Sequence, residues 1–397
     1  MTTTHEPLRL PAEATESARL AAPAPGSLVF STSARTLLGR PGERWTTACS
    51  GSPGWADTVV GALAPGERAV GVIGFDPASP GVMHRLLDAR EVPTTIPPET
   101  SAPTATSDRA QTLVEVPVPR LYADQVRAAL RAIADGAVDK VVLGRFLDVH
   151  SDPPLAVDEV VDRLLRTRPG RYVFSVPVPA PGPAPGDGQR DATVLGASPE
   201  LLVRREGTLV EAMPLAGSVP RSPDPAEDER RRAALASSAK DLHEHAFVVR
   251  DLVARLASAC DEVEHDVTPQ VVGTDSLWHL GTRVTARVRT GATGGPSALH
   301  LAQLLHPTPA VGGSPREAAL ALIERLETGE RGYLAGAAGW VDGNGDGEFA
   351  LVLRSGVLDG PRLRLFAGAG IVAGSDPDAE VRETAAKLRT MLEAVGL

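Results

Sequence analysis

Two periodicities alternate along the chain and predict a mixture of amphipathic helices and β-strands. Apolar residues recur every three or four positions in 122–138, as on the buried face of a helix, and 224–262 is predicted to form one long helical stretch. Short apolar runs bounded by Gly, Pro and Asp predict single strands over 139–150 and 276–289 and a β-meander over 333–375. Because hairpins and long helices are segregated in the sequence, the pattern favours an α+β fold over a doubly wound parallel sheet.

The last helical segment carries an unusual column of charge. Asp376 and Pro377 occupy the positions of an N-cap and a first-turn proline. Glu380, Glu383 and Lys387 follow at i, i+3 and i+7, which places them on one strip about 60° wide. One interpretation is a solvated face with a Glu383–Lys387 pair, and the other is a functional site; the helix alone leaves both open. The predicted buried face consists of Leu388, Met391 and Leu392.

Composition and charge exclude several classes of protein. The chain has 397 residues, 42% of them hydrophobic, which is enough for a substantial core. A formal charge of −10 without a basic patch argues against nucleic-acid binding. No stretch approaches the length of a membrane span, and the two cysteines form no disulfide framework, so we expect a soluble, cytoplasmic protein with no membrane partner. Two Pro-rich segments, 91–110 and 180–191, are predicted to be exposed connections.

Two charged residues beside apolar strands are candidates for proton transfer. Lys140 begins the apolar run "KVVLG"; burial can lower the pKa of a lysine and make it a base, although a strand-edge lysine that reaches water is common. Glu200 follows Ser-Pro between two apolar strands. A partly desolvated carboxylic acid can stay protonated and act as a general acid, whereas the simpler interpretation is an acid in a turn.

Two further motifs resemble metal sites. The stretch "HEH" at 243–245 lacks the H-E-x-x-H spacing of zinc proteases, but Glu244 could still bind a hard cation; taken alone, a surface acid is favoured. The stretch "DGNGDG" from Asp342 matches the start of a calcium loop, and a non-catalytic calcium- or partner-binding module is therefore a rival class. Leu353 stands where that loop needs a bidentate Glu, so a β-hairpin turn is favoured.

The order of several motifs resembles a known enzyme family. The motifs are "DKVVLGR", "GASPELL", "PLAGS", "KDLHEH", "LWHL", "LLHPTPAVGG", "GWVDGNGDGEFALVLRSG" and "LFAGAGIVAGSDPDAEVRETAAK". In this order they resemble the chorismate-utilising enzymes, and most closely the siderophore-type isochorismate synthases. The resemblance covers 115–395, the expected catalytic region, and implies that 1–110 is the N-terminal part of the same fold. It also implies one large α+β domain of two packed, mainly antiparallel sheets flanked by helices, as in anthranilate synthase component I.

The resemblance assigns roles to individual residues. It implies that Lys140 is the base that activates water and that Glu200 is the acid that protonates the leaving hydroxyl. It implies a Mg²⁺ ion bound by Glu244 and Glu383, with Glu380 in or next to the ligand shell. Lys387 and Arg354 are expected to hold the carboxylates of chorismate. The other substrate-binding positions that the resemblance implies are Gly217, Ser218, His279, Ala310, Leu334, Gly368, Ala369 and Gly370, and Leu334 departs from the aromatic residue that the family has there.

The expected function is Mg²⁺-dependent conversion of chorismate to isochorismate, feeding 2,3-dihydroxybenzoate and siderophore synthesis. Two related alternatives stay open. One is a salicylate synthase, which also eliminates pyruvate, and the other is an isochorismate synthase of the menaquinone pathway. We expect the protein to act as a monomer.

Overall fold

The structure of the protein is a computed structural model that describes residues 23–94, 110–180, 190–274, 277–289 and 295–397. Most of the two predicted Pro-rich connections, 91–110 and 180–191, lies outside these residues. The helices are α1 (Trp55–Gly61), α2 (Pro119–Ala134), α3 (Val157–Thr167), α4 (Pro225–Ser237), α5 (Ala239–Ala259), α6 (Ala298–Leu305), α7 (Arg316–Leu326) and α8 (Pro377–Ala394). Among the described residues, no helix is both long enough and apolar enough to cross a bilayer.

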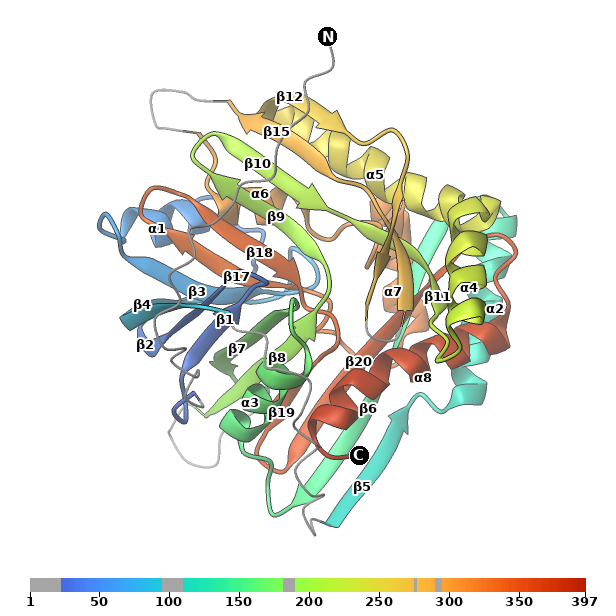
Figure 1. Ribbon diagram of the computed structural model, residues 1–397, viewed down its shortest axis with the longest axis horizontal. Coiled ribbons are helices and arrows are strands. Elements are labelled where there is room, and N and C mark those ends of the chain that lie inside the picture. The colour runs from blue at the N-terminus through green and yellow to red at the C-terminus, as the bar shows by residue number, and fades with distance from the viewer. Residues whose placement is uncertain (1–22, 95–109, 181–189, 275–276, 290–294) are drawn as a thin grey trace.

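Strands make up the interior of the molecule (Figure 1). In chain order they are β1 (Leu28–Ser31), β2 (Arg35–Thr47), β3 (Arg68–Ile73), β4 (Gly81–Pro93), β5 (Ala110–Val116), β6 (Lys140–Asp152), β7 (Tyr172–Pro179), β8 (Asp191–Ser198), β9 (Leu201–Glu206), β10 (Leu209–Met213), β11 (Leu215–Pro220), β12 (Cys260–His265), β13 (Gln270–Gly273), β14 (Leu277–Gly281), β15 (Val284–Val288), β16 (Gly313–Ser314), β17 (Ala337–Asp342), β18 (Gly347–Leu351), β19 (Ser355–Asp359) and β20 (Arg362–Ile371).

The sheet pairings are antiparallel, and the predicted α+β class is confirmed. Among the described strands, backbone pairing joins 17 into one network, while β11, β14 and β13 form a separate three-stranded sheet. The N-terminal strands belong to the same network, because β3 pairs with β17 along its length. In Figure 1 helices α2 and α4 lie at the right of the view, α5 at the upper right, and α8 crosses the lower right near β20.

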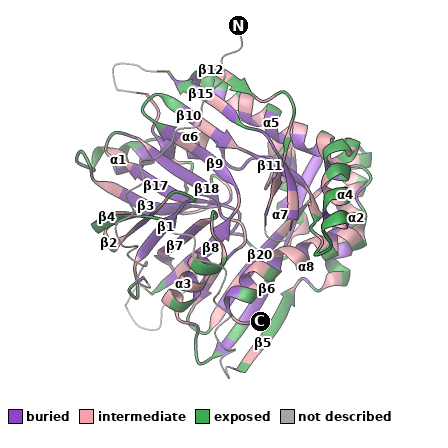
Figure 2. Ribbon diagram, viewed as in Figure 1, coloured by how far each residue is buried: buried purple, intermediate pink, exposed green. Residues whose placement is uncertain are grey.

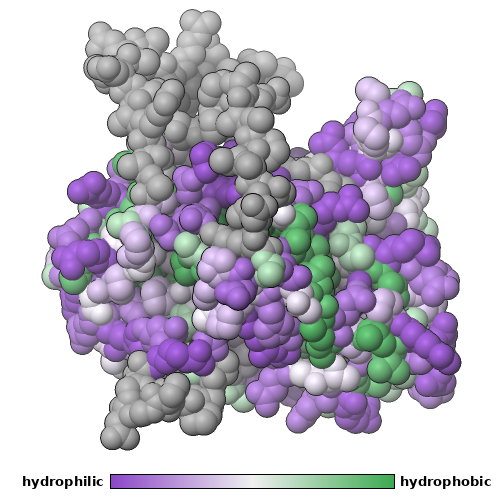
Figure 3. Space-filling view, turned by 90° about the horizontal axis from the view of Figure 1, so that it is seen from below, coloured by the Kyte–Doolittle hydropathy of each residue, from purple (hydrophilic) through white to green (hydrophobic). Residues whose placement is uncertain are grey.

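The larger hydrophobic cluster joins buried residues of many strands of the large sheet with residues of α1, α2, α5, α6 and α7. Figure 2 shows buried residues concentrated in the strands and exposed residues on α4 and β5. A smaller hydrophobic cluster lies beneath α3 and α8, where Leu388 and Met391 pack with Leu365 of β20. Figure 3 shows hydrophobic patches among hydrophilic surface on the face seen from below, and the exposed large hydrophobic residues include Leu113 of β5 and Leu121 of α2.

Two sequence predictions were wrong in detail. The stretch 224–262 is not one helix: it breaks at Ser238, and the strand β12 begins at Cys260. Ser238 ends α4 and serves as the N-cap of α5, where its Oγ accepts a hydrogen bond from the Asp241 N–H at 3.3 Å. Serine favours this capping geometry over a helix interior, which explains the break. The single strand predicted over 276–289 is two strands, because the chain passes from the small sheet at β14 to the large sheet at β15.

Two local predictions are confirmed. Asp376 caps α8 by accepting a hydrogen bond from the Ala379 N–H at 2.7 Å, and Pro377 occupies the first turn. The segment that resembles a calcium loop is the turn of the β17–β18 hairpin, as favoured from the sequence. Its Asp342 Oδ1 accepts the backbone N–H groups of Asn344 and Asp346 at 2.8 and 3.0 Å, so this carboxylate stabilises the turn.

Candidate active site

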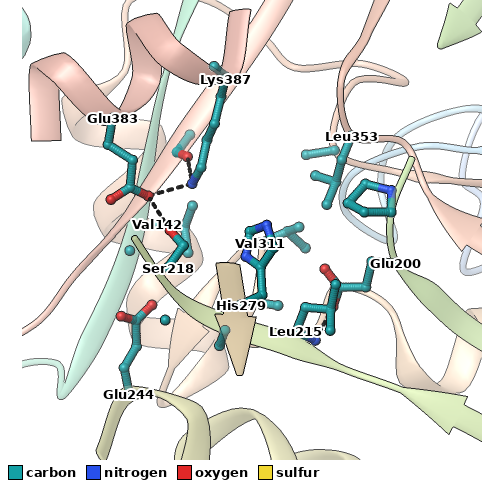
Figure 4. Close-up of a pocket in the computed structure, with 18 of the residues that line it drawn as sticks. Val142, Glu200, Leu215, Ser218, Glu244, His279, Val311, Leu353, Glu383 and Lys387 are labelled. Carbon is teal, nitrogen blue, oxygen red and sulfur yellow. Dashed lines mark hydrogen bonds and ion pairs between the residues drawn. The ribbon is translucent and has the colours of Figure 1, made fainter. Parts of the chain in front are cut away.

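A cavity of about 110 Å³ lies between β6, β20, the small sheet and helices α5 and α8 (Figure 4). One enclosed water needs roughly 10–15 Å³ by this measure, so the cavity has room for several water molecules or a small ligand. Residues predicted from widely separated segments meet here. Those that line the cavity are Lys140, Glu200, Gly217, Ser218, Glu244, His279, Ala310, Arg354, Gly368, Gly370, Glu380, Glu383 and Lys387.

Two predicted substrate-binding residues do not reach the cavity with their side chains. Ala369 is fully buried in the hydrophobic core, because successive side chains of β20 point to opposite faces and Gly368 and Gly370 face the cavity instead. Leu334 is also in the core, with 1% of its surface exposed. Its neighbour Ala335 lines the cavity and has a left-handed backbone, with φ of 60°.

Lys140 and Glu244 form a buried ion pair at the edge of the cavity. Lys140 is 1% exposed, which excludes a strand-edge lysine reaching water, and its Nζ lies 2.9 Å from Glu244 Oε1. Gly370 makes room for the pair: a Cβ atom there would lie 2.3 Å from Glu244 Oε1 and 3.1 Å from Lys140 Cε. The next residue, His245, points elsewhere, with its Nε2 2.7 Å from Thr282 Oγ1.

The column of charge on α8 is both an ion pair and part of the cavity wall. Lys387 Nζ lies 2.6 Å from Glu383 Oε1 and donates a hydrogen bond to the Gly368 carbonyl at 2.8 Å. Burial alone would raise the pKa of Glu383, but the Lys387 ammonium lowers it below its ordinary value. Figure 4 shows both side chains directed into the cavity near Ser218, whose Oγ lies 3.4 Å from Glu383 Oε1.

Glu380, the third predicted metal-binding carboxylate, has a raised pKa. Burial, and then the charge of Glu383 one turn away, raise the pKa of Glu380 to about 7. Its nearest cation is Lys240, whose Nζ lies 3.8 Å from Glu380 Oε1. Each of the three glutamates therefore has a lysine partner, and Glu380 has the most distant one.

Glu200 lies across the cavity from Glu244 in Figure 4. It is 4% exposed, and burial raises its pKa to about 8 although its Oε1 accepts the Leu215 N–H at 3.1 Å. At neutral pH this carboxyl group is therefore mostly protonated and can donate a proton. The structure therefore excludes a solvated acid in a turn at this position.

His279 and Arg354 complete the polar lining. Burial, followed by the positive charge of Arg354, holds the pKa of His279 well below its ordinary value, so the imidazole is neutral. Arg354 has a left-handed backbone, with φ of 48°, at the point where the chain leaves β18 and enters β19. Non-glycine residues rarely adopt this conformation, and it occurs preferentially at functional sites.

Several cavity residues were missed from the sequence. Lys240 and Asp241 are the polar ones, while Val142, Val311 and Phe366 form apolar wall. Lys240 lies four residues before Glu244, so helical spacing alone could have placed both on one face. Nothing in the local pattern around Val142 or Phe366 distinguishes a cavity wall from ordinary core.

The donor set suits a hard divalent cation. Among the described residues, no three His, Cys, Asp or Glu side chains lie close enough together to hold a metal ion by themselves. However, Mg²⁺ commonly takes only one or two protein carboxylates and keeps waters or substrate oxygens. Glu244, Glu380 and Glu383 face the same cavity, and burial followed by the charge of Glu383 raises the pKa of Glu380. The residues therefore fit such an ion completed by non-protein oxygens.

Comparisons with known proteins show the family of the chain. Residues 82–396 match the model of a family described as chorismate binding enzymes. The chain is 44% identical to the isochorismate synthase DhbC of Bacillus subtilis over 282 residues, which is 71% of this chain and 69% of that protein. It is 37% identical to the isochorismate synthase EntC of Escherichia coli over 331 residues, covering 83% and 81%. A crystal structure from Bacillus anthracis, assigned as a 2,3-dihydroxybenzoate-specific isochorismate synthase, superposes with a TM-score of 0.84 at 35% identity, over 94% of this chain and 97% of that one.

Proposed function

The chain belongs to the family of chorismate-binding enzymes, and we propose that it is an isochorismate synthase, an isomerase that converts chorismate to isochorismate. The Bacillus anthracis relative is assigned to 2,3-dihydroxybenzoate synthesis, and we extend this pathway, which supplies siderophores, to the present chain.

The reaction requires a base and an acid at different carbons of the same ring. Water adds at C2 of chorismate and gives up a proton, the ring double bonds shift, and the hydroxyl at C4 leaves with a proton as water. One water enters and one leaves, so the product is an isomer of unchanged mass. Such a step needs a proton acceptor and a proton donor on separate sides of the bound ring.

The position and protonation of Glu200 carry the proposal. Its pKa of about 8 supplies the protonated carboxyl that a leaving hydroxyl needs. It lies across the cavity from Glu244, which holds Lys140. We assign Lys140 to accept the proton of the attacking water, and Glu200 to protonate the C4 hydroxyl.

The remaining lining fits a substrate with two carboxylates. Lys387 and Arg354 supply positive charge in an otherwise acidic protein, and backbone groups at Gly217, Gly368 and Gly370 allow close approach of the ligand. Ser218, His279 and Ala310 contribute side chains to the same surface. Leu334 and Ala369 support this wall from the core side, so Ala369 would act through its backbone alone.

Mg²⁺ is the cofactor that we propose. Glu244 and Glu383 would hold it, with Glu380 beside them, and the bound ion would supply positive charge to a substrate carboxylate. The expected monomeric state and cytoplasmic location stay predictions.

Product analysis tests the proposal. The purified protein is incubated with chorismate in the presence of Mg²⁺ or of EDTA, and the products are separated by liquid chromatography and weighed by mass spectrometry. We expect an Mg²⁺-dependent isomer of chorismate that reaches equilibrium with it. Salicylate with pyruvate would instead indicate a salicylate synthase, and unconsumed chorismate would contradict the proposal.

A further inference from the structure

A buried ion pair lies directly behind the cavity wall. Arg331 is 5% exposed and follows α7, and its Nε lies 3.0 Å from Oε2 of Glu327, the residue that caps the end of that helix. Neither residue lines the cavity. A buried ion pair is weak evidence for stability, because the cost of desolvating two charges offsets their attraction. A contribution to stability is therefore not a sufficient reason for burying Arg331 and Glu327 at this position.

The pair bonds to the backbone of two wall segments. Arg331 Nη1 donates to the carbonyl of Val311 at 2.7 Å, and its Nη2 donates to the carbonyl of Val142 at 2.8 Å. Glu327 Oε1 accepts the N–H of Gly144 at 2.7 Å. Val142 and Val311 line the cavity, and their segments belong to β6 and to the loop between α6 and α7.

The hydrogen bonds of Arg331 and Glu327 restrain the start of β6, which carries Lys140. The loop pairs with β6 through two backbone bonds, from Asp139 N–H to the Ser314 carbonyl at 2.8 Å and from Val142 N–H to the Gly312 carbonyl at 2.7 Å. Ser314 lies opposite Lys140 in this pairing. Arg331 donates hydrogen bonds to one carbonyl in each of these two segments, Val142 in β6 and Val311 in the loop. These bonds fix the position of β6 relative to the loop.

Arg331 also covers the outer face of an aromatic wall residue. Its guanidinium carbon lies 5.0 Å from the ring centre of Phe366, which lines the cavity, and 4.0 Å from that of Phe75. A planar guanidinium can stack on an aromatic face while its edge donates hydrogen bonds, which a lysine cannot reproduce.

We infer that Arg331 and Glu327 are positioning residues of the proposed reaction, holding β6, the α6–α7 loop and the Phe366 ring so that Lys140 faces the substrate carbon. This inference rests on the proposed function. A displacement of about 1 Å at reacting groups can cost on the order of a hundredfold in rate, so small shifts of β6 would be visible in turnover.

The test compares Arg331→Lys with a matched control, Arg364→Lys. Arg364 also pairs with a buried acid, Asp148, through two nitrogens and also stacks on a ring, that of Phe146, but it lies outside the cavity. We expect Arg331→Lys to lower kcat by about tenfold to a hundredfold with KM changed less than about threefold. Arg364→Lys should leave kcat within about twofold of the wild type.

Hydrogen exchange provides a second readout that does not depend on which product forms. In Arg331→Lys the amides of Val142 and Gly144 should exchange faster than in the wild type, and in Arg364→Lys they should not. If Arg331→Lys fails to fold, Glu327→Gln, which keeps the shape of the side chain, replaces it in the test and should also lower kcat.

Unchanged kcat and unchanged exchange in a folded variant would overturn the inference, as would equal losses of kcat in the Arg331 and Arg364 variants. If the wild type makes no isochorismate, the proposed function fails, while the exchange comparison still decides whether Arg331 orders β6.

Discussion

The protonation of Glu200 should set the alkaline limit of turnover. Its pKa of about 8 arises from burial, and the proton that it carries is the one that the leaving hydroxyl needs. The protonated fraction is about nine tenths at pH 7, about a half at pH 8 and about a tenth at pH 9. Because kcat/KM reports ionisations of the free enzyme, it should fall about tenfold per pH unit above pH 8.

The assay is kcat/KM for isochorismate formation from pH 6 to 10, with far-UV circular dichroism at each pH. Glu200→Gln should lower turnover by about a hundredfold or more, because a general acid contributes roughly 10²–10⁴ in rate. Glu348→Gln is the matched control: Glu348 is buried in β18 and its pKa is also raised, chiefly by burial, but it does not line the cavity. An alkaline limb that persists in an active Glu200→Gln variant, or a profile flat to pH 10 in the folded wild type, would refute the reasoning.

The same shift has a consequence for stability. The native state holds a proton on Glu200 up to a pKa of about 8, whereas the ordinary value of 4.5 applies in the unfolded chain. Between these values the native state binds more protons than the unfolded state, so this residue's contribution to stability is present at low pH and is lost as pH rises through about 8. Denaturant unfolding of the wild type and Glu200→Gln between pH 5 and 8 should show that the variant loses less stability with rising pH.

Other predictions follow from the same site and its supports. Lys140→Ala should fold normally by circular dichroism and lose about a hundredfold or more in turnover, and an active variant would exclude it as the base. Gly370→Ala should impair turnover, because the added Cβ would lie 2.3 Å from Glu244 Oε1, whereas Gly61→Ala, with open space around it, should not. EDTA should stop turnover and added Mg²⁺ should restore it; activity at full rate in EDTA would exclude the cofactor. Asp376→Ala should lower the unfolding free energy by about 1 kcal/mol through loss of the α8 cap, measured by urea denaturation against Asp376→Asn.

Local chemistry was the part of the structure that the sequence predicted best. The cap formed by Asp376 and Pro377, the Glu383–Lys387 pair and the turn at Asp342 depend on residues close in the chain, and all three are present. The sequence left two interpretations of Glu383 open, an ion pair with Lys387 or a site residue. Both hold, because the ion pair itself lines the cavity.

Contacts between distant segments could not be predicted. Lys240 and Glu380 are separated by 140 positions and meet only because α5 and α8 both border the cavity. Whether Ala369 or its glycine neighbours face the cavity depends on the register of β20 against β6. The sequence does not specify this register, because β20 is apolar and rich in glycine here and has no alternation of polar and apolar residues. Arg331 likewise has no local signal, since its role depends on carbonyls contributed by Val142 and Val311.

The fate of oxygen during turnover tests the central claim most directly. Chorismate is converted in water enriched in oxygen-18 with Mg²⁺ present, and the product is examined by mass spectrometry before the reverse reaction becomes significant. Addition of solvent water at C2, activated by Lys140 as Glu200 protonates the C4 hydroxyl, predicts isochorismate that carries one oxygen-18 atom. Isochorismate without the label would show that the original hydroxyl is transferred within the molecule and would contradict the assigned roles of both residues.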